Sequence, residues 1–142
     1  MIIFDLDGTL SILGDRLKYL RLGMEDWDSF FEACAEDTIN EPIGKIFRAL
    51  RNTNQVLKIV TGRPERVRQK TLYWLEQNDL SIASQDLQMR SDNDFRHDTL
   101  IKPELIIDFK DQIEMIFEDR NSMVKKWRKL GFLCLQVAEG NF

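Results

Sequence analysis

The sequence contains few of the residues on which several protein classes depend. Among its 142 residues are two cysteines, Cys34 and Cys134, which lie in unrelated contexts and lack CxxC spacing. This scarcity argues against a disulfide framework and indicates two core or surface thiols in a reducing compartment. His97 is the single histidine, and we expect it to lie at the surface or to have a local structural role.

Long apolar runs and an excess of positive charge are also missing. No apolar run approaches the roughly 20 residues that a membrane-spanning helix needs, and the first residues lack the pattern of a signal peptide. The net charge of -4 provides no overall positive field that would draw the protein to long nucleic acids or anionic membranes. We therefore predict an intracellular, cytoplasmic protein that does not associate with membranes.

The chain has no repeats, low-complexity tracts or linker-like stretches, which predicts a single domain over residues 1–142. Apolar segments of strand length alternate with amphipathic segments of helix length. The expected strands are 2–5, 56–61, 87–90, 113–118 and 133–137, and the expected helices are 27–35, 42–52, 64–77, 99–109 and 122–130. This alternation predicts an α/β fold of three layers, with helices on both faces of a parallel sheet of about five strands.

Polar side chains follow several of the expected strands. Asp5 and Asp7 end the first strand in "MIIFDLDGTL", Thr61 ends the second in "IVTGRPE", and Asp119 ends the fourth in "MIFEDRN". Lys102 lies in "DTLIKPEL", in the helix that precedes the fourth strand. Because ligands of parallel sheets bind beyond the carboxyl ends of the strands, we expect these side chains to form one site.

These motifs, in this order, resemble the haloacid dehalogenase-like phosphohydrolase superfamily, whose motifs are DxDGT, a strand-terminal Ser or Thr, a Lys, and a strand ending in acids. The resemblance covers essentially the whole chain and implies a Rossmann-like fold. It implies that Asp5 is the nucleophile, forming an aspartyl-phosphate, and that Asp7 is the general acid and base. Thr61 and Lys102 would complete the catalytic set by binding the phosphoryl oxygens.

The resemblance also implies a magnesium site. Mg²⁺ prefers oxygen ligands, and the implied ligands are Asp5, the backbone carbonyl of Asp7, and Asp119. The fourth motif of the superfamily often reads Asp-Asp, whereas here it reads Glu118-Asp119. We therefore expect Glu118 to lie outside the inner ligand shell. Gly8 is expected to let the chain turn sharply away from the first strand.

Two segments carry a more specific resemblance. The stretches "LQMRSDNDFRHDTLIK" and "DRNSMVKKWRKLGFLCLQVAEGNF" are similar to the 3′-phosphatase domain of phage bifunctional polynucleotide kinase/phosphatases. This similarity implies a phosphatase for polynucleotide 3′ ends in nucleic-acid end repair, and suggests a phage origin. The 142 residues contain no GxxxxGK[ST] phosphate loop, so we expect a phosphatase that works beside a separate kinase or ligase.

Two other functions remain open at this point. The first is a phosphatase for free nucleotides or other small phosphate esters, which the acidic net charge and the short chain favour. The second is a non-catalytic binding protein that keeps the fold. The intact set of acids, hydroxyl and ammonium argues against this second alternative.

Substrate binding is assigned to one glycine and to arginines near the motifs, because guanidinium groups suit phosphates and a glycine backbone allows close approach. These candidates are Gly62, Arg63, Arg90, Arg96 and Arg16. The alternative for Arg90 and Arg96 is pairing with Asp94 and Asp98.

The segment 11–41 is expected to form a small flap over the site in place of a large cap domain, which leaves room for a large substrate. Within it, Trp27, Phe30 and Phe31 recur at helical spacing, so they form either a packed helix face or a platform for a base. Asp37 is expected to be a turn or capping residue.

Overall fold

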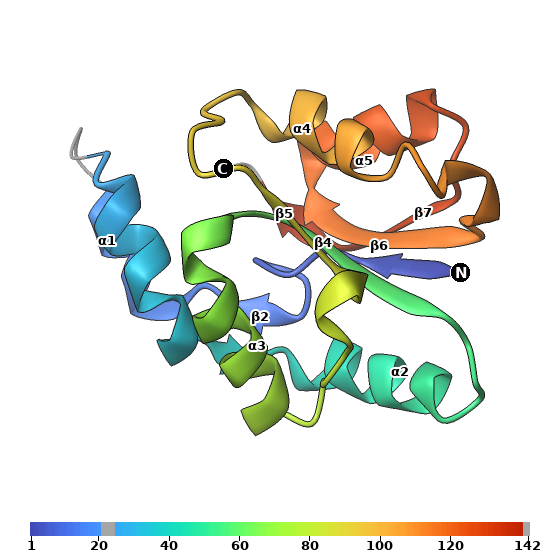
Figure 1. Cartoon of the computed structure of the whole chain (residues 1–142), viewed down its shortest axis with the longest axis horizontal. Helices are drawn as coiled ribbons and strands as arrows, with labels where there is room; N and C mark the ends of the chain where they lie inside the picture. The colour runs from blue at the N-terminus through green and yellow to red at the C-terminus, as the bar shows by residue number, and fades with distance from the viewer. Residues whose placement is uncertain (21–24, 141–142) are drawn as a thin grey trace.

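The computed structural model of the chain describes residues 1–20 and 25–140. Five parallel strands form one sheet in the order β5–β4–β1–β6–β7 (Figure 1). These strands are β1 (Ile2–Phe4), β4 (Leu57–Pro64), β5 (Leu87–Arg90), β6 (Met115–Arg120) and β7 (Cys134–Gly140).

Helices cover both faces of this sheet. The helices α2 (Glu41–Arg51) and α3 (Arg68–Gln77) lie on one face, and α4 (Asp98–Leu105) and α5 (Asn121–Lys129) lie on the other (Figure 1). The predicted three-layer α/β architecture is therefore confirmed.

Alternating side chains of the strands build a separate core on each face. Ile2 and Phe4 lie in the core on the side of α2 and α3, whereas Ile3 lies in the core on the side of α5. The ring of Phe4 stacks on Phe117 of β6 at a centroid distance of 4.4 Å, and Phe47 of α2 meets Phe4 edge-on at 5.1 Å. Burial on both faces explains why the central strands are continuous apolar runs in the sequence.

The largest differences between expected and observed helix boundaries are four residues, at the start of one helix and at the end of another. The helix expected over 64–77 begins only at Arg68, because Pro64 is still part of β4 and keeps an extended backbone with φ -74° and ψ 155°. The helix expected over 99–109 spans Asp98–Leu105 and ends two residues after Pro103. Proline lacks the N–H that helix hydrogen bonding needs, which weakens a helix at this point.

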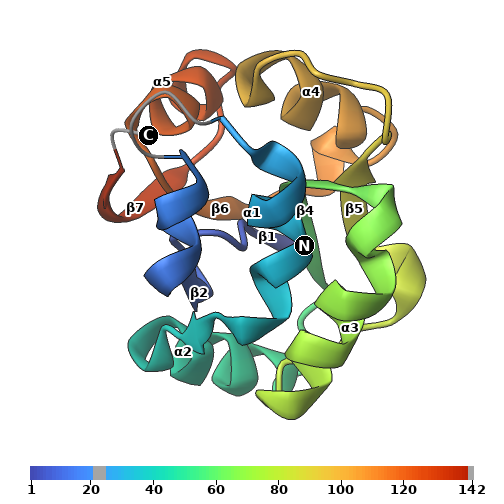
Figure 2. The same cartoon turned by 90° about the vertical axis from the view of Figure 1, so that its left-hand side faces the viewer.

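The insertion 11–41 lies at one end of the sheet (Figures 1 and 2). Strands β2 (Ser11–Ile12) and β3 (Thr38–Ile39) pair in antiparallel fashion and frame it. Between them lie the 3-10 helix η1 (Gly14–Leu20), α1 (Trp27–Glu32) and the 3-10 helix η2 (Ala33–Glu36). Residues 21–24 of the insertion and the last two residues of the tail motif, 141–142, lie outside the described residues.

Three smaller expectations concern the cysteines, the histidine and membranes. Cys34 and Cys134 are both buried and free, so they are core thiols. His97 precedes α4, and its Nδ1 accepts a hydrogen bond of 3.3 Å from the backbone N–H of Thr99, which confirms a local structural role. Within residues 1–20 and 25–140, no helix is long and apolar enough to cross a membrane.

Candidate active site

A buried ion-pair network lies where β1 and β6 reach the carboxyl edge of the sheet. Lys102 of α4 donates from Nζ to Oδ1 of Asp5 at 2.6 Å and to Oε2 of Glu118 at 2.9 Å. Asp119 follows Glu118 in β6, and each of these four residues is at most 4% exposed. The structure thus brings together motifs that are about a hundred residues apart in the chain.

This network has more negative than positive charge. Carboxylate oxygens of Asp5, Glu118 and Asp119 all lie within 4.8 Å of one another, and Lys102 supplies the ammonium that bonds two of them. Burial and the Glu118 charge raise the pKa of Asp5 well above its usual range, although Lys102 acts in the opposite direction. Burial and Glu118 also raise the pKa of Asp119 to about 6. A hard divalent cation would compensate this excess charge.

Both carboxylate oxygens of Glu118 accept hydrogen bonds from protein donors. Oε2 accepts from Lys102 and, at 3.4 Å, from the indole N–H of Trp127. Oε1 accepts at 3.3 Å from the backbone N–H groups of Asp119 and Arg120. Glu118 therefore orients Lys102, as a residue behind the inner shell would.

The loop after β1 reaches Asp119 through Gly8 and Thr9. Gly8 has φ +90°, and a Cβ at this position would lie 2.2 Å from Oδ2 of Asp119. Glycine is therefore required both for the turn and for the approach of Asp119. The hydroxyl of Thr9 donates to Oδ1 of Asp119 at 3.3 Å, which links the first motif to the fourth.

Asp7 belongs to a second buried cluster, formed with Arg16, Arg63 and Asp37. The carboxylate of Asp7 accepts from Nε and Nη2 of Arg63, at 3.0 and 2.5 Å, and also pairs with Arg16. Asp37 accepts from Nε of Arg16 at 2.6 Å and from Nη2 of Arg63 at 3.1 Å. Burial opposes ionisation of Asp7, but Arg63 and Arg16 outweigh it and lower its pKa. The carboxylate is thereby held ionised in one orientation.

This cluster differs from three expectations drawn from the sequence. Arg16 and Arg63 were expected to contact substrate, but they are only 3% and 0% exposed and neither lines the cavity described below. Asp37 was expected in a turn or cap, but its carboxylate pairs with both arginines. These partners are 21 and 26 residues from Asp37, and no local pattern connects such distances.

Thr61 and Gly62 lie in β4 and line the same cavity as Asp5. Thr61 is fully buried, and its Oγ1 accepts a hydrogen bond of 3.2 Å from the backbone N–H of Arg63. A Cβ at Gly62 would lie 2.7 Å from Oδ1 of Asp98. Because Gly62 has no side chain, the carboxylate of Asp98 can lie against its backbone. The sequence led us to expect a different role for Gly62, namely close approach of its backbone to phosphate.

Asp98 is a site residue that the sequence analysis placed only as an ion-pair partner. Its carboxylate pairs with Arg90 and, at 2.7 Å, with Nη1 of Arg120. Burial opposes its ionisation, but Lys102, Arg120 and Arg90 together lower its pKa. Asp98 is the first residue of α4 and lies four residues before Lys102, a spacing that places both on one helix face. The four-residue spacing from Lys102 is the feature of the sequence that could have identified Asp98 as a site residue.

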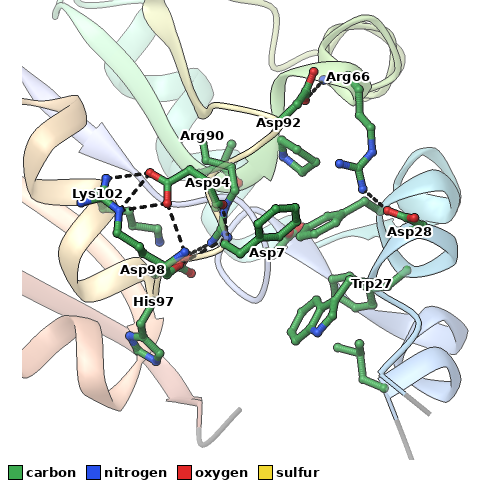
Figure 3. A pocket seen from close by; sticks show the side chains of 18 of the residues that line it. Asp7, Trp27, Asp28, Arg66, Arg90, Asp92, Asp94, His97, Asp98 and Lys102 are labelled. Atoms are coloured by element: carbon green, nitrogen blue, oxygen red, sulfur yellow. Dashed lines mark hydrogen bonds and ion pairs between the residues drawn. The ribbon is translucent and has the colours of Figure 1, made fainter.

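A cavity of about 410 Å³ opens above Asp5 and Lys102. Figure 3 shows Lys102 and Asp98 on one side of it and Trp27, Asp28 and Arg66 on the other. Arg90 and Arg96, which were predicted to bind substrate, also line the cavity. Both are paired in the structure, Arg90 with Asp98 and Arg96 with Asp94, which is the alternative considered from the sequence.

Comparisons with known proteins identify the family of the chain. The family model of the phosphatase domain of the polynucleotide kinase PNKP matches residues 1–142. A chain in a structure of the Pnkp1/Rnl/Hen1 RNA repair complex is 29% identical, with a TM-score of 0.83, and one in a second Pnkp1/Rnl/Hen1 structure is 30% identical, with a TM-score of 0.81. Both matches cover 99% of this chain but only 43% and 46% of the matched chains.

A more distant structure shares the fold. A haloacid dehalogenase-like hydrolase family protein from Streptococcus pneumoniae is 15% identical, with a TM-score of 0.60, over 95% of this chain and 82% of that one. The residue order of the motifs, the sheet and the match over the full sequence all lead to the same assignment. The chain belongs to the family of PNKP-type polynucleotide kinase phosphatase domains, which are phosphatases with the haloacid dehalogenase-like fold.

Proposed function

We propose that this phosphatase depends on Mg²⁺ and removes the phosphate monoester from polynucleotide 3′ ends through an aspartyl-phosphate. The observation that carries the proposal is the buried contact of 2.6 Å between Asp5 and Lys102, beside Asp119 and at the base of a cavity. This contact supports Asp5 as the nucleophile, because a fixed positive charge beside a carboxylate can stabilise the charge of the transferring phosphoryl group.

The acidic residues fit a magnesium ion. Asp5 and Asp119 offer carboxylate oxygens, and their pKa values are raised first by burial and then by the neighbouring charge of Glu118. We assign the ion to these two carboxylates and to the backbone carbonyl of Asp7, with Glu118 behind them. When bound, Mg²⁺ would neutralise charge on the transferring phosphoryl group.

In the first step, a carboxylate oxygen of Asp5 forms a bond to phosphorus while the bond from phosphorus to the 3′ oxygen breaks. The hydroxyl of Thr61 and the ammonium of Lys102 bind the phosphoryl oxygens. Asp7 gives a proton to the leaving 3′ oxygen. The products are a free 3′ hydroxyl and phosphorylated Asp5.

In the second step, Asp7 takes a proton from water as the water oxygen bonds to phosphorus. The bond between phosphorus and Asp5 breaks, which releases phosphate and restores the carboxylate. Arg16 and Arg63 favour the ionised form of Asp7 that this step needs. We therefore assign them as positioning residues for Asp7.

The setting of the reaction is proposed from the similar structures. The matched chains belong to complexes of Pnkp1, Rnl and Hen1, one of which is described as an RNA repair complex. We propose that this chain likewise acts in nucleic-acid end repair, beside a separate kinase or ligase.

Phosphate release with Mg²⁺ tests the proposal. We would compare a 3′-phosphorylated oligonucleotide with its 5′-phosphorylated counterpart and with free 3′ and 5′ mononucleotides, and use Asp5→Asn as the inactive control. We expect preferential loss of the 3′ phosphate from the oligonucleotide, and no release after chelation of the metal. Equal or faster release from mononucleotides would support a nucleotide phosphatase instead.

A further inference from the structure

The cavity has an apolar wall that the phosphoryl chemistry does not use. Asp5, Thr61 and Lys102, to which we assign the phosphoryl group, line one part of the cavity. The wall includes the apolar residues Leu13, Leu20, Trp27, Phe30, Phe31 and Phe95. A volume of about 410 Å³ lies within the range of about 300–1,000 Å³ that is common for small-molecule sites. A phosphate is polar and gains nothing from such a wall, so the wall is available to an apolar part of the substrate.

Trp27 lines this cavity and packs on Phe30 and Phe31. Phe30 and Phe31 are 5% and 8% exposed and belong to the core, whereas Trp27 is 48% exposed. The Trp27 ring lies 5.7 Å from the Phe30 ring, edge-on at 81°, and 6.0 Å from the Phe31 ring at 28°. Phe30 and Phe31 therefore form the packed helix face that was one alternative from the sequence, whereas Trp27 lies outside the core. Figure 3 shows the indole at the side of the cavity opposite Lys102.

Phe95 contributes a second ring, from the loop between β5 and α4. It is 85% exposed, although it lines the same cavity as Trp27. The loop is held by polar contacts, since Arg90 Nη1 donates to the carbonyl of Asp94 at 3.2 Å and Arg96 pairs with the Asp94 carboxylate at 2.7 Å. Phe95 is therefore exposed by a loop of defined conformation.

We infer that the nucleobase next to the 3′ phosphate binds against Trp27 and Phe95 while the phosphate lies on Asp5. This inference rests on the proposed function and specifies its substrate as a 3′ end that carries a terminal base. Aromatic side chains stack on any base, because every base has a π-face, so the wall would favour nucleotides without selecting a sequence. Trp27 and Phe95 then determine specificity and take no part in the chemical steps.

The test compares two 3′-phosphorylated oligonucleotides, one ending in a normal nucleotide and one in a tetrahydrofuran abasic analogue. For the wild-type protein we expect kcat/KM to be about tenfold higher with the base present. Trp27→Ala and Phe95→Ala should lower kcat/KM for the normal end, mainly through KM, by a clearly larger factor than for the abasic end. Trp27→Phe should restore part of the loss. Tyr73→Ala is the matched control, because Tyr73 is an exposed aromatic residue of α3 that does not line the cavity.

A binding measurement provides an independent readout. Trp74 and Trp127 are buried, so addition of the 3′-phosphorylated oligonucleotide to Asp5→Asn should quench mainly Trp27, and the abasic end should quench it less. Equal kcat/KM for both ends in the wild-type protein, or an equal effect of Trp27→Ala on both, would overturn the inference while leaving the proposed function intact. Absence of Asp5-dependent release from both oligonucleotides would overturn the proposed function and this inference together.

Discussion

The carboxyl group of Asp7 must act both as an acid and as a base. In the proposed mechanism it is protonated for the first step and ionised for the second. The structure pairs it with Arg63 and Arg16, which lower its pKa and so favour the ionised form. A protonated Asp7 is then a strong acid toward the leaving oxygen, although this form is present in a small amount at neutral pH.

Arg16→Gln tests this account at the level of one residue. Removing one guanidinium raises the pKa of Asp7, so its protonated form persists to higher pH. The alkaline limb of the pH profile of kcat/KM should therefore move to higher pH, and kcat should fall because the carboxylate is less well oriented. The measurement is the pH profile with the 3′-phosphorylated oligonucleotide.

Arg51→Gln is the control for this profile, because Arg51 pairs with Asp79 at 2.9 Å and does not line the cavity. Its profile should match that of the wild-type protein. An alkaline limb that stays in place in Arg16→Gln would show that Arg16 does not set the pKa of Asp7.

At the scale of elements, the insertion is attached to the sheet domain in two ways. Asp37 pairs with Arg16 and Arg63 in the interior, and its backbone carbonyl accepts a hydrogen bond of 2.7 Å from the indole of Trp74 in α3. On the surface, Asp28 pairs with Arg66 and Glu32 pairs with Lys70. Exposed ion pairs contribute little to stability, whereas breaking a buried pair leaves an uncompensated charge.

We therefore predict that Asp37→Asn lowers the free energy of unfolding by about 3–5 kcal/mol. The double variant Asp28→Asn/Glu32→Gln removes both surface pairs and should leave the urea midpoint unchanged within error. Urea denaturation of the three proteins at neutral pH provides the comparison. A larger loss in the double variant than in Asp37→Asn would show that the surface pairs hold the insertion.

At the scale of the whole molecule, the grouping of the motif residues was predictable because parallel strands end at one edge of a sheet. Asp5, Thr61 and Asp119 follow or end the apolar runs of their strands, so topology alone places them near one another. The Asp7 cluster was not predictable, because it depends on how the insertion packs, which brings Asp37 next to Arg16 and Arg63. The start of α3 was misplaced because Pro64 suits both an extended strand end and the first turn of a helix.

The central claim is that Asp5 is phosphorylated during turnover, and acid quenching tests it most directly. Wild-type protein and Asp5→Asn would each be mixed with Mg²⁺ and an oligonucleotide carrying a radiolabelled 3′ phosphate, then quenched in acid within the first turnover. The account predicts label on the wild-type protein, appearing before free phosphate, and none on Asp5→Asn. Release of phosphate with no labelled protein at any time, or equal label on both proteins, would contradict it.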